Sequence, residues 1–320
     1  MKRTTVANAL LLLIGLGLAV AVAWPRPGQE PRRRVVLATH SASAPIPPLD
    51  FDSTGVRDAT GHLLRRQRYQ RIVSTNLVTD RLLVELCEPA RILAVSRAAA
   101  ARQRDGHRYQ GLRTVDGFGA PEAMVALKPD LVLTNSFGAP GVAARLRDAG
   151  IEVFELGELR GERSFAFVVS SLGVLLGVPE RAERLRASFG SRMRALPASR
   201  GQAPPRRALF LSTLGPDLQG GTIGTSYHDI LVAAGLVDVA AERYRDWPAY
   251  SSEQVLALQP EIVVTRRGYA AAICHYPGMD HIDPCRGQGA IVEIDGELLD
   301  EPGLAMLEAA EELFAAVYRR

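Results

Sequence analysis

A short segment near the carboxyl end gathers residue types that bind metals or form disulfides. In order along the chain these are Cys274, His275, Pro277, Gly278, Asp280, His281, Asp283, Pro284 and Cys285. Thiolate, imidazole and carboxylate groups are zinc ligands, but their spacing here fits no standard zinc finger. The prolines and the glycine predict turns, which could instead bring the two cysteines together. The segment therefore allows two chemistries, a disulfide or a metal site.

A second group has the residue types of a catalytic triad, at Ser226, His228 and Asp229. Adjacency in sequence does not make a proton relay, and residues 224–228 lack the second glycine of a nucleophile elbow. We interpret Ser226 as a helix N-cap. The glycine-rich run 220–226 lacks the Gly-Lys-Ser/Thr ending of a phosphate loop and the Rossmann spacing, so no nucleotide or other cofactor is predicted.

The amino terminus predicts export. Met1-Lys2-Arg3 is a positive start, residues 6–24 are mostly apolar, and Ala21-Val22-Ala23 offers a cleavage site. The apolar run of about 19 residues would also just span a bilayer, so residues 1–23 are either a signal peptide or an uncleaved anchor. Because exported cysteines are commonly oxidised, we predict a disulfide between Cys274 and Cys285 and no metal site. Cys87 lies in the apolar pattern of a helix and is expected in the core.

Charge excludes nucleic acid as a partner. The 320 residues include 38 Lys and Arg against 35 Asp and Glu, a net charge of only +3. No basic field is available to attract a polyanion.

The elements that must position any site begin at Arg71. Residues 24–70 are rich in Pro, Ser, Arg and Thr, and we predict an extension there. From residue 71, short β-rich runs alternate with amphipathic helical runs, which is typical of parallel α/β architecture. The expected strands are 72–74, 92–95, 131–134 and 153–156, and the expected helices are 80–87, 121–127 and 141–149. Residues 71–160 are therefore expected to form one small α/β lobe.

A helical segment and linker, 161–204, should connect this lobe to a second one, 205–320. Residues 179–196 have helical periodicity between two prolines and would reach about 27 Å, enough to cross between lobes. The second lobe should contain strands at 208–212, 262–265 and 290–294, and helices at 228–234, 253–258 and 302–318. The fold class predicted is α/β, with two small lobes that have central parallel sheets and are joined by a long inter-lobe helix.

An internal near-repeat supports two lobes built on one plan. Residues 121–134 reappear, with substitutions, as residues 252–265. Both copies place a glutamate, Glu122 and Glu253, at the opening of a helix, where a carboxylate faces the positive end of the helix dipole.

These segments resemble the helical-backbone class of ABC-importer binding proteins, which includes cobalamin, haem and ferric siderophore receptors. The segments that carry the resemblance are 57–61, 71–74, 126–132, 172–179, 233–236 and 295–299. The resemblance implies an exported substrate-binding protein that holds a metal chelate between its lobes and docks on the permease dimer of an ABC importer. It also implies that Glu122 and Glu253 are the docking residues, one in each lobe.

In open α/β sheets, ligands bind beyond the carboxyl ends of the strands, so the residues that follow the strands are the ligand candidates. They are Thr75, Asn76, Arg97, Phe118, Asn135 and Phe137 in the first lobe, and Trp247, Tyr250, Arg266, Arg267 and Tyr269 in the second. Aromatic rings offer flat faces to a macrocycle or catechol, and arginines pair with anionic groups. Residues 117–119 contain no tyrosine to serve as an axial ligand, which favours a corrinoid or ferric siderophore over haem.

Two other functions remain open. One is a membrane-anchored periplasmic sensor or accessory domain of the same fold without transport, which an uncleaved N-terminus would favour. The other is an exported enzyme, which would require the Cys/His segment or Ser226 to be catalytic. We expect a binding protein rather than an enzyme, located in the periplasm and either free or tethered through its N-terminus.

Overall fold

The computed structural model describes residues 55–116, 121–135, 141–213 and 217–319. The chain divides into two compact units, Met1–Ala44 and Pro45–Arg320, and every described residue belongs to the second. Predictions for the signal or anchor segment therefore lie outside the described residues. None of the helices in the described ranges is long and apolar enough to cross a membrane.

The first lobe is built on a parallel sheet with the strand order β5-β4-β3-β6-β7. Its strands are β3 (Ile72–Ser74), β4 (Ile92–Ser96), β5 (Arg113–Val115), β6 (Leu131–Thr134) and β7 (Glu152–Glu155). The predicted strands are confirmed. β5 was not predicted, because two of its three residues are exposed and polar at the sheet edge.

Helices surround this sheet: α2 (Leu77–Leu86), α3 (Arg97–Ala100), α4 (Pro121–Ala126) and α5 (Val142–Asp148), with single 3₁₀ turns at Pro89–Arg91 and Gly106–Tyr109. α2 begins three residues earlier than predicted. Its start is fixed by Asn76, whose side-chain oxygen accepts a hydrogen bond from the Val78 N–H at 2.9 Å.

A hairpin of β1 (Gly55–Arg57) and β2 (Leu63–Arg65) precedes the sheet and packs against helix α6 and β7. Val56, Leu64 and Tyr69 are at most 1% exposed and join the main hydrophobic cluster. Residues 55–70, expected to be part of an extension, thus contribute to the core. The turn-forming Asp58 explains why, since its buried carboxylate holds the hairpin to β7.

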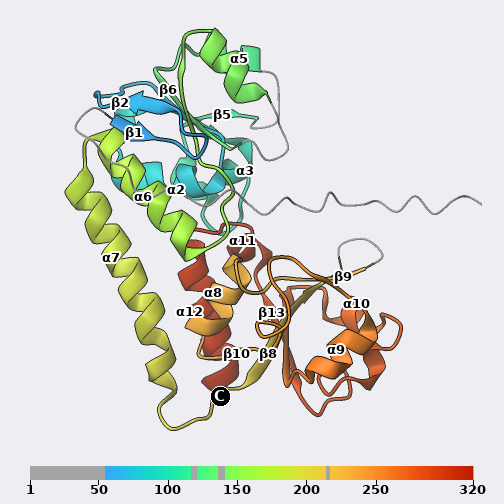
Figure 1. The fold of residues 1–320 in the computed structure, drawn as a ribbon. Helices are drawn as coiled ribbons and strands as arrows, with labels where there is room; N and C mark the ends of the chain where they lie inside the picture. Colours follow the sequence, from blue (N-terminus) through green and yellow to red (C-terminus); the bar gives the residue numbers. More distant parts are fainter. Residues whose placement is uncertain (1–54, 117–120, 136–140, 214–216, 320) are drawn as a thin grey trace, which may run out of the picture. The chain divides into compact units, whose positions relative to one another are not determined.

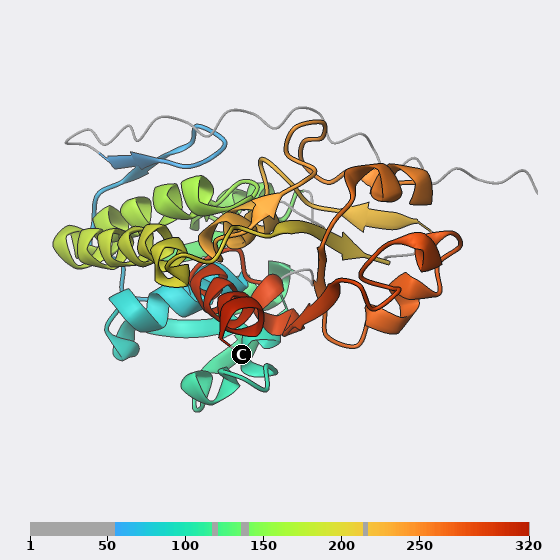
Figure 2. The same cartoon turned by 90° about the horizontal axis from the view of Figure 1, so that it is seen from below.

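Two helices follow β7, namely α6 (Glu162–Leu176) and α7 (Pro179–Ala195). They are separated by Gly177 in the left-handed conformation and by Pro179 at the first position of α7. They pack closely, because a Cβ on Gly173 would lie 2.5 Å from the Cβ of Ala182. Figures 1 and 2 both show α7 beside α6, and its far end contacts α12 of the second lobe. The predicted long helix is confirmed as α7, which ends in a 3₁₀ turn at Leu196–Arg200.

The second lobe has the strand order β11-β9-β8-β12-β13, with β10 also beside β8. The strands are β8 (Arg207–Ser212), β9 (Leu218–Gly220), β10 (Val237–Asp238), β11 (Ala249–Tyr250), β12 (Ile262–Arg266) and β13 (Ala290–Ile294). β8, β10, β12 and β13 are parallel, as predicted for the centre of the sheet. β9 pairs antiparallel with both β8 and β11, and these two short strands extend one edge. The helices are α8 (Ser226–Ala233), α9 (Ser252–Leu258), α10 (Ala270–Cys274), α11 (Gly296–Leu299) and α12 (Ala305–Tyr318), with a 3₁₀ turn at Met279–His281.

The near-repeat forms the same backbone in both lobes. α4 leads into β6, and α9 leads into β12, through a left-handed residue followed by proline. Lys128, with φ 51°, precedes Pro129, and Gln259, with φ 48°, precedes Pro260. Outside glycine, left-handed backbone is uncommon, so its occurrence at equivalent positions is a specific structural match.

The same contacts stabilise both copies. The guanidinium of Arg71 donates to the carbonyls of residues 127 and 128, and Arg207 does the same to those of 258 and 259. The Asp130 carboxylate accepts from the Arg71 N–H at 2.8 Å, and the Glu261 carboxylate accepts from the Arg207 N–H at 3.2 Å. The duplicated sequence therefore encodes a duplicated helix-to-strand connection.

Candidate functional site

Polar residues of the first lobe lie at one edge of its sheet. Thr75, Arg97 and Asn135 directly follow β3, β4 and β6, which are neighbouring parallel strands. The Thr75 hydroxyl donates to the Thr134 hydroxyl at 2.9 Å, and the amide of Asn76 caps α2. The predicted positions at the strand ends are thus observed, and Thr75, Asn76 and Asn135 are half-buried.

Arg97 differs from these neighbours. It is exposed at the start of α3, and no hydrogen bond or ion pair joins its side chain to another described residue. It therefore offers a positive charge that an anionic ligand could use. Phe118 and Phe137, the aromatic candidates of this lobe, lie outside the described residues.

The arginines at the end of β12 are paired within the chain. Arg266 makes a two-pronged contact with Asp300, including Nη1 to Oδ2 at 3.0 Å, and these hydrogen bonds raise the pKa of its guanidinium. Arg267 donates from Nη2 to Glu312 at 2.9 Å. Tyr269 follows them and is half-buried. Binding an anion through either arginine would have to compete with these carboxylates.

The two aromatic candidates before α9 differ in exposure. Tyr250 is 3% exposed, its ring packs edge-on against Tyr244 with centroids 5.0 Å apart, and burial raises the pKa of its hydroxyl. Trp247 is 38% exposed, and the Arg160 guanidinium lies 4.5 Å from its ring centroid. Arg160 also pairs with Glu158 at 2.8 Å. Trp247 thus presents a ring already held in a cation–π contact, whereas Tyr250 belongs to the core.

A pocket of about 510 Å³ lies where the first turns of α6 and α8 meet. It is lined by Arg160, Gly161, Glu162, Arg163, Ser164, Ala166, Gly224, Thr225 and Asp229. Asp229 of α8 accepts a hydrogen bond from the Glu162 N–H at 2.7 Å and so caps α6, and burial raises the pKa of this carboxyl. None of the described residues predicted to bind ligand lines this pocket. The sequence signal that could have identified this pocket is a glycine shortly before each helix, Gly161 before α6 and Gly224 before α8.

Charged contacts join the lobes beside α2 and α3, and they were not predicted. Arg81 of α2 pairs with Glu301 at 3.1 Å and with Glu308 of α12. The Glu297 carboxylate accepts from the backbone N–H groups of residues 103 and 104 at 2.8 and 3.0 Å. Glu301 is 2% exposed, and burial raises its pKa to about 7 despite the opposing effect of Arg81. Both lobes thus meet through buried as well as exposed charges.

Glu122 and Glu253 occupy equivalent positions, each the second residue of its helix, α4 or α9. Both are exposed. The first turn of α9 is fixed by a reciprocal cap between Ser251 and Gln254, and hydrogen bonding by Ser251 lowers the pKa of Glu253. Each lobe therefore carries one exposed, negatively charged carboxylate at an equivalent position of the duplicated helix.

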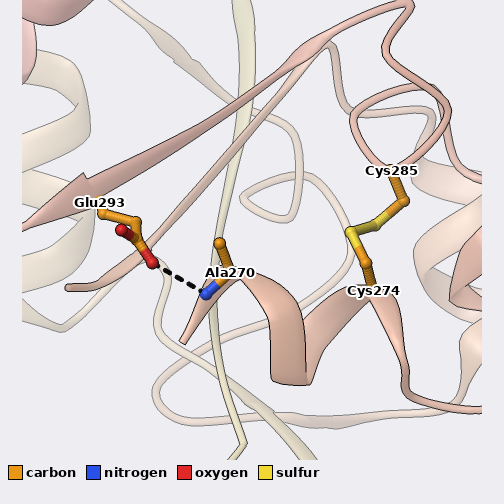
Figure 3. The surroundings of a disulfide bond; sticks show 4 residues. All are labelled: Ala270, Cys274, Cys285 and Glu293. Carbon is orange, nitrogen blue, oxygen red and sulfur yellow. Dashed lines mark hydrogen bonds between the residues drawn. A yellow bond between two sulfur atoms is a disulfide. The ribbon is translucent and has the colours of Figure 1, made fainter. Parts of the chain in front are cut away.

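The predicted disulfide between Cys274 and Cys285 is confirmed. Figure 3 shows it at the end of α10, whose first N–H groups include that of Ala270, which donates to Glu293 at 2.9 Å. Cys87 is free and buried, as expected. Within the described ranges, no group of three or more His, Cys, Asp or Glu residues is arranged to hold a metal ion.

The triad residue types do not form a relay among themselves. His228 bonds through Nδ1 to the Asp238 carboxylate at 2.8 Å, while Asp229 caps α6. Ser226 is the first residue of α8, and the N-cap is Thr225, so the interpretation of Ser226 as the cap was off by one position. The Thr225 hydroxyl instead donates to the Thr222 carbonyl at 2.8 Å, which fixes the preceding turn.

Comparison with known proteins identifies the architecture. Residues 72–312 match the protein family described as periplasmic binding protein. The vitamin B12-binding protein of Salmonella typhimurium is 29% identical over 144 residues, which cover 45% of this chain and 53% of that protein. The chain thus spans about half the length of the vitamin B12-binding proteins that it matches. The cobalamin-binding protein of Halobacterium salinarum strain R1 is 24% identical over 264 residues, 80% of this chain and 68% of that protein.

A solved structure gives the same fold. The periplasmic haem-binding protein HutB of Vibrio cholerae superposes with a TM-score of 0.66 at 21% identity, covering 78% of this chain and 99% of that one.

Proposed function

Because the chain belongs to the periplasmic binding protein family, we propose that it is the exported substrate-binding protein of an ABC importer and that it binds a metal chelate. The observation that carries this proposal is a family match that spans both lobes and the helices joining them. Relatives named for vitamin B12 and cobalamin support a corrinoid, and a ferric siderophore is the next candidate. Haem ranks below these because residues 117–119 contain no tyrosine.

The ligand is proposed to lie between the strand ends of the two lobes. In the first lobe Thr75, Asn76 and Asn135 offer hydrogen bonds, and Arg97 offers a charge without a partner among the described residues. The aromatic residues Phe118 and Phe137 are proposed to add apolar contacts.

In the second lobe Trp247 and Tyr269 are proposed to contact the ligand through their rings. Arg266 and Arg267 are proposed to contribute less than Arg97, because each already has a carboxylate partner. Tyr250 is 3% exposed and packs against Tyr244, so it is not proposed to contact the ligand directly.

Ligand binding is tested by fluorescence and thermal-shift titration of the exported part of the chain. The panel is cobalamin, cobinamide, hemin and several ferric siderophores, and one of them should bind saturably. Arg97→Ala should weaken binding of an anionic chelate about tenfold, whereas Arg184→Ala, an exposed arginine on α7, should not. Absence of binding across the panel would favour the membrane-anchored sensor instead.

We further propose that Glu122 and Glu253 dock on arginines of the permease. Their equivalent positions and their exposure support this role. Replacing either with alanine should reduce uptake of the bound chelate without changing its affinity, and the double variant should abolish uptake. Glu242→Ala, an exposed glutamate elsewhere in the second lobe, is the matched control. Normal uptake by the double variant would contradict this docking role.

A further inference from the structure

The segment closed by the disulfide, residues 274–285, packs directly on α9. Met279 and Ile282 from this segment are at most 2% exposed, and they share a hydrophobic cluster with Val255 and Leu258 of α9. The disulfide joins the two ends of the segment, so it restricts the same residues that cover the helix.

A second contact reaches the first turn of α9. The hydroxyl of Ser252, the residue before Glu253, donates a hydrogen bond to the Pro277 carbonyl. Next to it, Gly278 has a φ of 82°, and a Cβ there would lie 2.9 Å from the Cβ of Ser252. The segment therefore contacts α9 at two places, its apolar face at Val255 and Leu258 and its N-terminal end at Ser252. These contacts lie on both sides of Glu253 in the sequence.

Apart from this segment, α9 is held at its C-terminal end, where the Arg207 guanidinium donates to the carbonyls of residues 258 and 259. It contains seven residues, and a helix this short is marginal without tertiary packing. Its own cap between Ser251 and Gln254 sets the first turn but does not fix where that turn lies on the lobe. The covering segment provides that second restraint.

We propose that the disulfide-closed segment is a positioning element for permease docking: it holds the first turn of α9, and with it Glu253, in a fixed place on the second lobe. This inference rests on the proposed docking function of Glu253. The segment acts on docking through α9.

The test measures binding of the chelate-loaded protein to the permease of its importer, reconstituted in lipid nanodiscs. Cys274→Ala/Cys285→Ala should weaken this binding about five- to tenfold while chelate affinity stays within twofold. Ser252→Ala, which keeps the disulfide, should weaken it about threefold. Ser252→Thr, which retains a hydroxyl, should bind nearly normally, and Ser188→Ala on α7 is the control for loss of an exposed serine.

The outcomes separate this inference from the docking function itself. Native permease affinity in both Ser252→Ala and the double cysteine variant, with loss of affinity in Glu253→Ala, would overturn the positioning role alone. If Glu253→Ala also bound normally, the docking function would fail and the positioning role with it. Should the double cysteine variant not fold, the comparison of Ser252→Ala with Ser252→Thr decides the question.

Discussion

Replacement of Asp58 should destabilise the first lobe more than any surface change. Its carboxylate is fully buried and accepts hydrogen bonds from the Thr60 N–H at 2.9 Å, the Thr60 hydroxyl at 2.7 Å and the His62 N–H at 3.0 Å. It also accepts from the Glu155 N–H at 3.2 Å and pairs with Arg147 at 2.9 Å. One side chain thus closes the β1–β2 turn and joins it to β7.

The expected loss for Asp58→Ala follows from these contacts. Removing one partner of a buried ion pair costs about 3–5 kcal/mol, and the N–H groups left without an acceptor add to that cost. The Arg147 side chain is 25% exposed and can reach water, so we expect the lower end, about 3 kcal/mol. Asp58→Asn keeps the shape but loses the charge and part of the accepting capacity, and should lose about 2 kcal/mol.

Urea unfolding followed by circular dichroism measures this difference. A loss of about 3 kcal/mol should lower the unfolding midpoint by about 1 M, given a slope of about 3 kcal/mol per M for a chain of this size. Asp283→Ala, at an exposed aspartate, should leave the midpoint unchanged. A loss below about 1 kcal/mol for Asp58→Ala would refute the view that this carboxylate anchors the hairpin.

Three further changes test other parts of the structure. Burial raises the pKa of Glu301 from 4.5 to about 7, so its contribution to stability is present below pH 4.5 and is lost as the pH rises through 7. The free energy of unfolding should therefore fall by about 1–3 kcal/mol between pH 5 and 8, and Glu301→Gln should flatten that fall in urea titrations at each pH. Replacing Cys274 and Cys285 with alanine should cost about 3 kcal/mol in thermal unfolding, because the bond spans 11 residues; an unchanged melting temperature would contradict this. Lys128→Gly and Gln259→Gly should each raise the free energy of unfolding by about 0.5–1 kcal/mol in calorimetry, because glycine removes the steric cost of left-handed backbone. A lower free energy of unfolding in both variants would contradict the presence of such a cost at these positions.

The buried strands could be predicted because each has an apolar run with turn residues at its ends. β3, β6 and β12 are covered on both faces, so each begins with an uninterrupted apolar run and turns polar only at its carboxyl end. β5 escaped prediction because Arg113 and Thr114 are exposed at the sheet edge. β9 and β11 escaped because each has only two or three residues, too few to show a strand pattern.

The site was predictable only in part, for a related reason. The rule on strand ends placed Thr75 and Arg97 correctly at one edge, since it depends on local order along a parallel sheet. It could not show that Arg266 meets Asp300, 34 residues later, or that Arg81 meets Glu301, 220 residues later. Those pairs form through packing between elements, and a charged residue that will be buried has no distinguishing mark in the sequence.

The state of the cysteines makes this protein well suited to site-specific labelling. Cys274 and Cys285 are bonded to each other, and Cys87 is 4% exposed with a thiol whose pKa burial raises, so it stays protonated and reacts slowly. An added cysteine would then be the only readily modified thiol of the chain. Leu256, 44% exposed on α9, is a suitable position for Leu256→Cys. A dye attached there would report contacts at this helix without removal of any native cysteine.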